Sequence, residues 1–247
     1  MGMPQWAIEL ACFFWEDAGG DESFPRGLRR AIANALPLSV VLLPRLRVAA
    51  IDVWLREQAD RGRLGFPDRP LRACLVARHG QGIIFLDGTD PDDEQRFSLA
   101  HECAHFLRGY WQPRRVAVDR LGSAVVEVLD GDRPVRPEER MDALLARVPL
   151  GFHVHLMDRT AAGRFASEVI DDAERDADVL AYELLAPSAF VLATTRAGSS
   201  SDRRATVAAE LTHGYGLPAR VAARYAAILV PRADRSDSLM HRLGLRA

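Results

Sequence analysis

Hydrophobic and polar residues follow two different periods along the first 90 residues. Apolar residues that recur every three to four positions indicate amphipathic helices, and short runs of apolar or β-branched residues indicate buried strands. The helical pattern covers Trp6–Trp15, Gly27–Leu36 and Val48–Gln58. The strand pattern covers Ser39–Leu43, Leu71–Arg78 and Gly82–Leu86. The turn residues His79-Gly80-Gln81 predict that the last two strands form a hairpin.

A further helix is predicted shortly after this hairpin. Asp90 is placed as its N-cap and Pro91 at its first helical position, and Asp92 and Asp93 favour the positive end of the helix dipole. We expect the helix to run to Arg108 and to stop at Gly109, because glycine commonly ends helices.

The remaining chain is predicted to be mostly helical. An apolar run at Ala124–Leu129 is followed by a predicted helix at Pro137–Ala146, a strand at Gly151–Met157, and a helix from about Asp171 to Leu185 that Pro187 ends. The segment from Ala197 to Asp202 is typical of a flexible linker. Two more helices, Ala205–Thr212 and Ala219–Leu229, flank a Gly214-Tyr215-Gly216 turn. The pattern predicts an α+β fold with a small β-sheet and a C-terminal helical segment.

Composition mainly excludes classes of protein. The 247 residues carry a formal net charge of -2, so the overall basic field of a nucleic-acid binder is missing. Three cysteines form no short-spaced pair, which favours a reducing cytoplasm. The apolar stretch at Trp6–Trp15 contains Glu9 and is shorter than the roughly 20 residues of a membrane span. We therefore expect no secretion and no membrane association.

The predicted helix at 90–108 carries the string His101-Glu102-Cys103-Ala104-His105. In this HExxH pattern two histidines bind zinc and the glutamate acts as general base. At about 100° per residue, the two histidines, Glu102 and Arg108 fall within one sector of about 120°, and apolar residues fill the rest. A surface helix with two exposed histidines would not have this apolar remainder. Cys103 faces away from the polar sector and is expected to be a core thiol.

A catalytic zinc site normally has three protein ligands, so a third must come from elsewhere. The metzincin continuation would need glycine at 108 and histidine at 111, where this chain has Arg108 and Trp111. A glutamate from a second helix is the alternative, and Glu174 offers it. Asp178, four residues on and therefore on the same helix face, could accept a hydrogen bond from a ligand histidine.

Other polar residues are weaker candidates for the site. His153 and His155 point to one face of the predicted strand, as ordinary strand residues, as substrate contacts or as a rival third ligand. Tyr182 is either an oxyanion donor or a packed core residue. Arg108 pairs with a substrate carboxylate or with Glu102, or it is a solvated charge at the helix end.

Several of these stretches form a combination more specific than HExxH alone. They are Arg96–Leu107, the group Glu174, Ala177 and Asp178, the segment Leu184–Pro187, and the hairpin ending Ile83–Leu86. Together they resemble the ImmA/IrrE family of metallopeptidases, over roughly residues 70–107 and 174–187. The chain departs from the family pattern at Leu180 and Ala186, where bulky Phe and Met are usual.

The resemblance implies a zincin-like peptidase core. His101, His105 and Glu174 would bind zinc, Asp178 would orient a ligand histidine, and Glu102 would be the general base. It also implies a protein substrate, namely a transcriptional repressor with a helix-turn-helix domain, cleaved in stress response or mobile-element regulation. The gap from 105 to 174 is long for the family, so we expect an inserted subdomain at 110–170 within a peptidase domain at 1–190.

The family often carries a helix-turn-helix-like segment after the peptidase core. Here the corresponding residues 203–231 are expected to form a helical hairpin packed on the core, followed by a tail at 232–247. Glu210 and many alanines dilute its basic residues, so we do not expect direct DNA binding. Two other readings stay open: a non-proteolytic protein-binding module with a structural or latent zinc site, and a DNA-binding regulator. Manganese or iron could occupy a similar ligand set.

Overall fold

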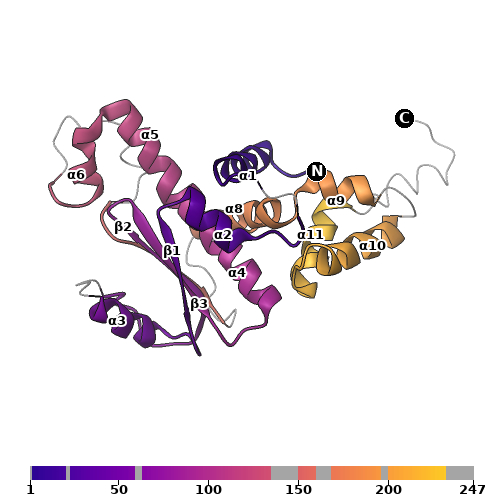
Figure 1. Cartoon of the computed structure of the whole chain (residues 1–247), viewed down its shortest axis with the longest axis horizontal. Coiled ribbons are helices and arrows are strands. Elements are labelled where there is room, and N and C mark those ends of the chain that lie inside the picture. Colours follow the sequence, from indigo (N-terminus) through magenta and orange to yellow (C-terminus); the bar gives the residue numbers. More distant parts are fainter. Residues whose placement is uncertain are drawn as a thin grey trace.

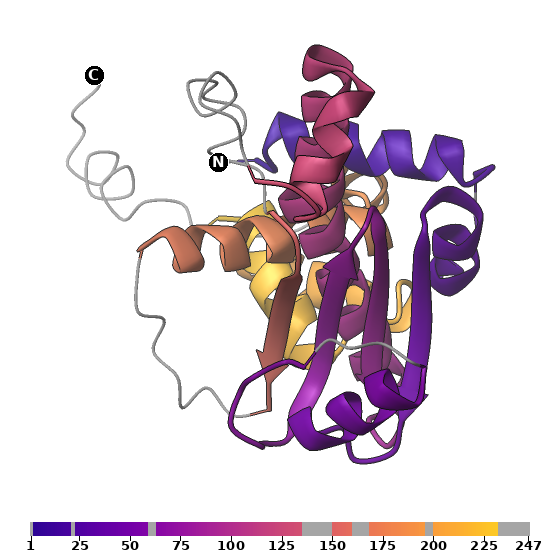
Figure 2. The ribbon, with the colours of Figure 1, turned by 90° about the vertical axis from the view of Figure 1, so that its left-hand side faces the viewer.

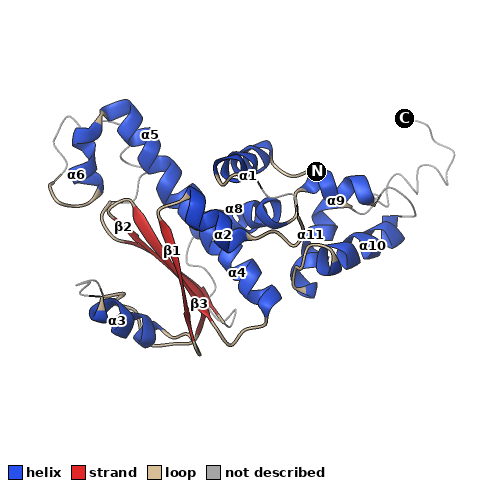
Figure 3. Cartoon of the chain, viewed as in Figure 1, coloured by secondary structure: helices blue, strands red, loops and turns tan. Residues whose placement is uncertain are grey.

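The structure is a computed structural model that describes residues 2–20, 23–58, 63–134, 150–159, 168–195 and 200–231. One small β-sheet stands against a larger body of helices (Figures 1 and 3). The predicted α+β fold class is therefore confirmed, and the arrangement is compatible with a zincin-like core.

The sheet has four strands in the order β1-β3-β2-β4. They are β1 (Leu38–Leu43), β2 (Leu71–Arg78), β3 (Gln81–Asp87) and β4 (His153–Asp158). β1 is parallel to β3, and the other two pairs are antiparallel. β2 and β3 form the predicted hairpin, whose connecting residues His79 and Gly80 have φ of 50° and 72°. Positive φ at both positions is what a two-residue turn between twisted strands requires.

Helices cover both faces of the sheet, which explains why β2 is an almost continuous apolar run. Cys74 and Val76 pack with Ile51 of α3 (Val48–Glu57) in one hydrophobic cluster. Ala73 and Leu75 of the same strand belong to the larger cluster on the opposite face. That larger cluster includes α1 (Gln5–Asp17), α2 (Leu28–Ala35) and α4 (Asp92–His105). The predictions for these first helices and strands are confirmed.

The predicted ends of α4 are wrong at both sides. Pro91 is the N-cap, with an extended ψ of 151°, and the carboxylate of Asp90 pairs with Arg159 at 2.7 Å. At the other end the helix does not stop at Gly109. It continues through a π-helical turn, η1 (Phe106–Trp111), into α5 (Gln112–Leu121). The glycine that follows the last helical residue is Gly122, whose φ of 79° is the left-handed conformation absent at Gly109.

The stretch after α5 contains both an outlying cluster and a strand of the main sheet. η2 (Ser123–Val125) and α6 (Val126–Leu129) pack with Ala117 of α5 in a small separate cluster. β4, in contrast, pairs with β2 at the edge of the sheet (Figure 2). The predicted helix at 137–146 lies outside the described residues, and the boundaries of the expected insertion stay a prediction.

The C-terminal part is a set of four helices on the core. They are α8 (Glu168–Leu185), α9 (Ser188–Thr194), α10 (Ser200–His213) and α11 (Ala219–Leu229). α10 and α11 form the predicted hairpin, and their side chains Leu211 and Tyr225 are buried in the main cluster. The predicted linker is wrong from Ser200 to Asp202, which begin α10, while residues 196–199 lie outside the described part.

Within the described ranges no single helix is both long and apolar enough to cross a membrane. Residues Asp172–Leu185 of α8 and Ser188–Thr194 of α9 meet that requirement only together, across a bend of 57°.

Candidate metal centre

Two histidines of α4 point the same ring nitrogen at one spot in the interior. His101 and His105 are 4% and 8% exposed, and their Nε2 atoms lie 3.1 Å apart. Glu102, on the same helix, is completely buried. The i, i+4 spacing places the two rings one above the other on one side of the helix, as the sequence predicts.

α8 brings a carboxylate to the same spot. Glu174 Oε2 lies 3.4 Å from His101 Nε2, and Oε1 lies 3.4 Å from His105 Nε2. Ala177 and Ala181 of α8 are buried, and the helix packs directly against α4. Their small side chains let the two helix backbones approach, which is how residues about 70 positions apart in the sequence come to face each other.

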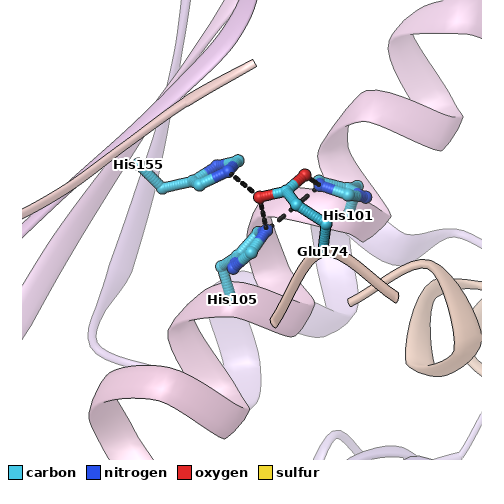
Figure 4. Close-up of side chains that lie close together, drawn as sticks. All are labelled: His101, His105, His155 and Glu174. Carbon is cyan, nitrogen blue, oxygen red and sulfur yellow. Dashed lines mark hydrogen bonds and ion pairs between the residues drawn. The ribbon is translucent and has the colours of Figure 1, made fainter. Parts of the chain in front are cut away.

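The edge strand β4 contributes a third imidazole (Figure 4). His155 Nε2 lies 2.7 Å from Glu174 Oε1, and its Nδ1 lies 2.9 Å from Glu102 Oε2. The ring also stacks on His105, with 3.6 Å between centroids. His153, two residues earlier, stays outside this cluster and stacks on Tyr110 instead. Of the roles open to the two strand histidines, the structure places only His155 among the candidate ligands.

Two polar contacts, both made by Asp178, connect His101 with the C-terminal hairpin of α10 and α11. Asp178 Oδ1 lies 3.0 Å from His101 Nδ1, the ring nitrogen that faces away from Glu174. Its other oxygen accepts a hydrogen bond from Arg224 of α11 at 3.0 Å. The position of Asp178 is the one that sequence spacing suggests, whereas nothing in the sequence indicates the contact with Arg224.

The electrostatics of His105 and Glu174 suit metal binding, whereas those of His155 favour its protonated form. Burial lowers the pKa of His105 to about 4, which keeps its ring neutral at pH 7 and able to bind a cation. Burial alone would raise the pKa of Glu174, but hydrogen bonds from the three histidines outweigh it and hold the pKa far below its usual range. Burial also opposes charge on His155, yet the Glu102 carboxylate and the hydrogen bonds to both glutamates raise its pKa to about 10.

The donor atoms fit a metal ion. One ligand atom from each of His101, His105, His155 and Glu174 lies within 4.8 Å of all the others. Imidazole nitrogens with a carboxylate oxygen are a usual ligand set for zinc. Glu102 Oε1 is buried and has no hydrogen-bond partner in the part of the chain that the structure describes. A buried carboxylate oxygen without a partner is costly, and a bound metal with its water would remove that cost.

A cleft of about 680 Å³ opens beside the cluster, lined among others by His101, Glu174, Asp178 and Tyr182. Tyr182 itself is 1% exposed and stacks on Tyr225, with 4.5 Å between ring centroids. It is therefore packed as a core residue, although its hydroxyl has no partner among the described residues.

Arg108 and Cys103, which lie in or just after the HExxH sequence, point away from the four candidate ligands. Arg108 pairs with Asp176 at 3.4 Å and stands over the ring of Trp6, so of the three roles open to it the pairing with Glu102 is not found. The reason is geometric, because Arg108 belongs to the π-helical turn that follows α4. Cys103 is fully buried in the main core, as expected of a core thiol, and burial raises its pKa.

Comparison with known protein families agrees with this picture. Residues 58–122 match the family model described as the IrrE N-terminal-like domain of a peptidase family. The match includes β2, β3 and the whole HExxH helix, and it confirms the resemblance to the ImmA/IrrE family. None of the curated proteins matches the chain. The matched residues do not extend to β4 or α8, so the family match supports a metallopeptidase-type function but does not include His155 or Glu174.

Proposed function

We propose that this chain, which carries an IrrE N-terminal-like domain, is a zinc-dependent endopeptidase that hydrolyses a peptide bond in a protein substrate. The observation that carries the proposal is the convergence of His101, His105 and Glu174 on one point beside Glu102. Hydrolytic zinc sites usually have three protein ligands, such as two histidines and a glutamate, and a second glutamate nearby that acts as general base.

Each residue of the site would have a separate role in the reaction. His101, His105 and Glu174 would hold the ion, and Asp178 would keep the proton of His101 on Nδ1, so that Nε2 remains a ligand atom. A zinc ion held there supplies Lewis-acid polarisation of the scissile carbonyl and an acidified water. Glu102, buried and with one oxygen unpartnered among the described residues, would accept the proton of that water and return it to the leaving amine.

The cleft beside the cluster is the place for the substrate chain. Its walls come from α4, α8, β4 and α11 of the C-terminal hairpin, together with Arg72 of β2. The biological substrate is proposed from the family resemblance alone: a helix-turn-helix repressor whose cleavage would release genes of stress response or of a mobile element. We do not propose that this chain binds DNA directly. Arg220 and Arg224 of the hairpin are each paired with a carboxylate of the core.

Replacing Glu102 with glutamine tests the peptidase proposal. Zinc content and cleavage of fluorescein-labelled casein, or of a small repressor encoded next to this chain, are measured on wild type and Glu102→Gln. We expect the variant to keep its zinc and to lose cleavage by at least about 100-fold, the lower range for a general base. Asp92→Asn is the matched control, because it changes an exposed carboxylate at the start of the same helix. Measurable cleavage that is equally fast in wild type and Glu102→Gln would contradict the proposal.

A second candidate function is a protein-binding module in which the zinc is structural or latent. The observation that favours it is His155, since four protein donors leave a tetrahedral metal no free position. For such a module, Glu102→Gln would leave the biological action of the protein unchanged.

A further inference from the structure

His155 lies between the two glutamates of the site. One ring nitrogen contacts Glu102 at 2.9 Å and the other contacts Glu174 at 2.7 Å. A water activated at this site must lie within hydrogen-bond reach of Glu102 and next to the atoms that hold the metal. The ring of His155 lies between Glu102 and Glu174, and Figure 4 shows it facing Glu174 and His105.

His155 also has the chemistry of a ligand. Its Nε2 is one of the four donor atoms that lie within 4.8 Å of one another, and imidazole nitrogen is a common zinc ligand. Ligand histidines usually donate their second N–H to a carboxylate, which fixes the ring. For His155 that carboxylate is Glu102, the proposed general base. Coordination through Nε2 would therefore fill the water position and engage the base at the same time. The ring must be neutral to bind, and metal binding ordinarily displaces such ligand protons.

The element that carries His155 is the one best able to move. Within the described residues the backbone of β4 pairs with β2 alone, at the edge of the sheet, and the pairing is irregular near Leu71. Side chains of β4 are only partly buried. His101 and His105, by contrast, belong to a helix whose second half is entirely buried. Withdrawing an edge strand breaks one ladder, whereas moving α4 would disrupt the core.

We propose that His155 is a fourth protein ligand of the metal, so that the resting site is closed and cleavage requires β4 to take His155 away. The inference rests on the proposed peptidase function. The chain would then be a latent enzyme, which becomes active when its edge strand β4 moves His155 away from the metal.

The test compares wild type, His155→Ala and His155→Gln, with His153→Ala as the matched control from the same face of β4. Zinc affinity is measured by competition with a chromophoric chelator, and the coordination number by the visible spectrum of the cobalt(II) form. Loss of a residue behind the ligands commonly weakens binding 10–100-fold, so loss of a ligand should weaken it by at least about 100-fold. We expect this loss and a weaker, shifted cobalt spectrum for both His155 variants, together with faster cleavage of labelled casein. His153→Ala should match wild type in all three.

Each result has a separate meaning. An unchanged zinc affinity and cobalt(II) spectrum in the His155 variants would overturn the inference. An unchanged zinc affinity combined with slower cleavage would also overturn it, because that result indicates that His155 contacts the substrate. An altered spectrum with no cleavage by any form, wild type included, would support the fourth ligand and contradict the peptidase function. Thermal unfolding shows whether His155→Ala folds. If it does not, His155→Gln, which keeps a polar side chain of similar length, carries the test.

Discussion

Replacing Asp178 with alanine is expected to weaken zinc binding although every proposed ligand stays in place. The carboxylate lies 3.0 Å from His101 Nδ1 and fixes the tautomer in which Nε2 carries the lone pair. It also holds Arg224, a residue of the C-terminal hairpin, at 3.0 Å. Without the carboxylate, the ring of His101 can turn or place its proton on the nitrogen that should bind the metal.

The size of the effect follows from these contacts. Removing the carboxylate behind a ligand histidine typically costs 10–100-fold in metal affinity, or about 1.4–2.7 kcal/mol. The side chain of Asp178 is 23% exposed and lines the cleft, so water can partly replace it. We therefore expect about 10–100-fold for Asp178→Ala and about tenfold or less for Asp178→Asn, which keeps an acceptor. Arg224→Gln should cost less than about fivefold, because Arg224 is 65% exposed and such pairs contribute at most about 1 kcal/mol.

Competition for zinc against a chromophoric chelator measures these differences directly. Asp176→Ala is the matched control: it removes a carboxylate from the same helix, two residues earlier, that pairs with Arg108 instead of a histidine. Its zinc affinity should equal that of wild type. Wild-type zinc affinity in Asp178→Ala, or an equal loss of affinity in Asp176→Ala, would contradict this role of Asp178.

Two further predictions concern stability. A side chain at Gly82 would place Cβ 2.6 Å from Leu38 Cδ1 and 2.8 Å from Phe106 Cε2, so Gly82→Ala should lower stability by about 1–3 kcal/mol. Gly109→Ala, whose added Cβ would meet no heavy atom within 4 Å apart from its neighbouring residues and the backbone of its own helix, should not lower it. Equal melting temperatures for the two variants would contradict this difference. Burial raises the pKa of Glu183 in the folded protein above its value of about 4.5 in the unfolded chain. The neutral carboxyl therefore stabilises the fold fully at pH values below the unfolded pKa, and this stabilisation is lost as the pH rises through the folded pKa. Glu183→Gln should therefore gain stability over wild type at pH 8 and little at pH 4, as measured by urea unfolding, and an equal difference at both pH values would argue against it.

Local patterns predicted most of the elements because each pattern has one dominant cause. β2 reads as an uninterrupted apolar run since Leu75 faces one helical layer and Val76 faces the other. α8 was recognisable from its apolar period and from Pro187, which cannot continue a helix. For the site, the spacing of His101 and His105 suffices to place two rings together on any helix, whatever the rest of the fold.

Helix ends were predicted less well, because competing partners decide them. Asp90 has the right side chain for an N-cap, but Arg159, nearly 70 residues away, pairs with its carboxylate. Gly109 is a good stop signal only if it takes a left-handed conformation, and burial of Phe106 and Tyr110 on either side of it favours continuing the helix through a π-turn. Neither tertiary contact is visible in the local sequence.

His155 marks the limit of reading a site from sequence, because its place depends on register. β4 pairs with β2 so that His155 stands opposite Leu75, whose side chain belongs to the core that contains α4. Val154 and Leu156 pack on the opposite face, against the cluster of α3. A shift of one residue in this pairing would exchange the two faces and turn both histidines of β4 away from the metal centre. The sequence does hold a signal, since two histidines alternating with apolar residues put imidazoles on a face that the fold buries. Only the pairing of strands some 80 residues apart shows that His155 reaches Glu102 and Glu174. In the proposed closed site, the position of this edge strand therefore decides whether His155 blocks the metal or leaves it open.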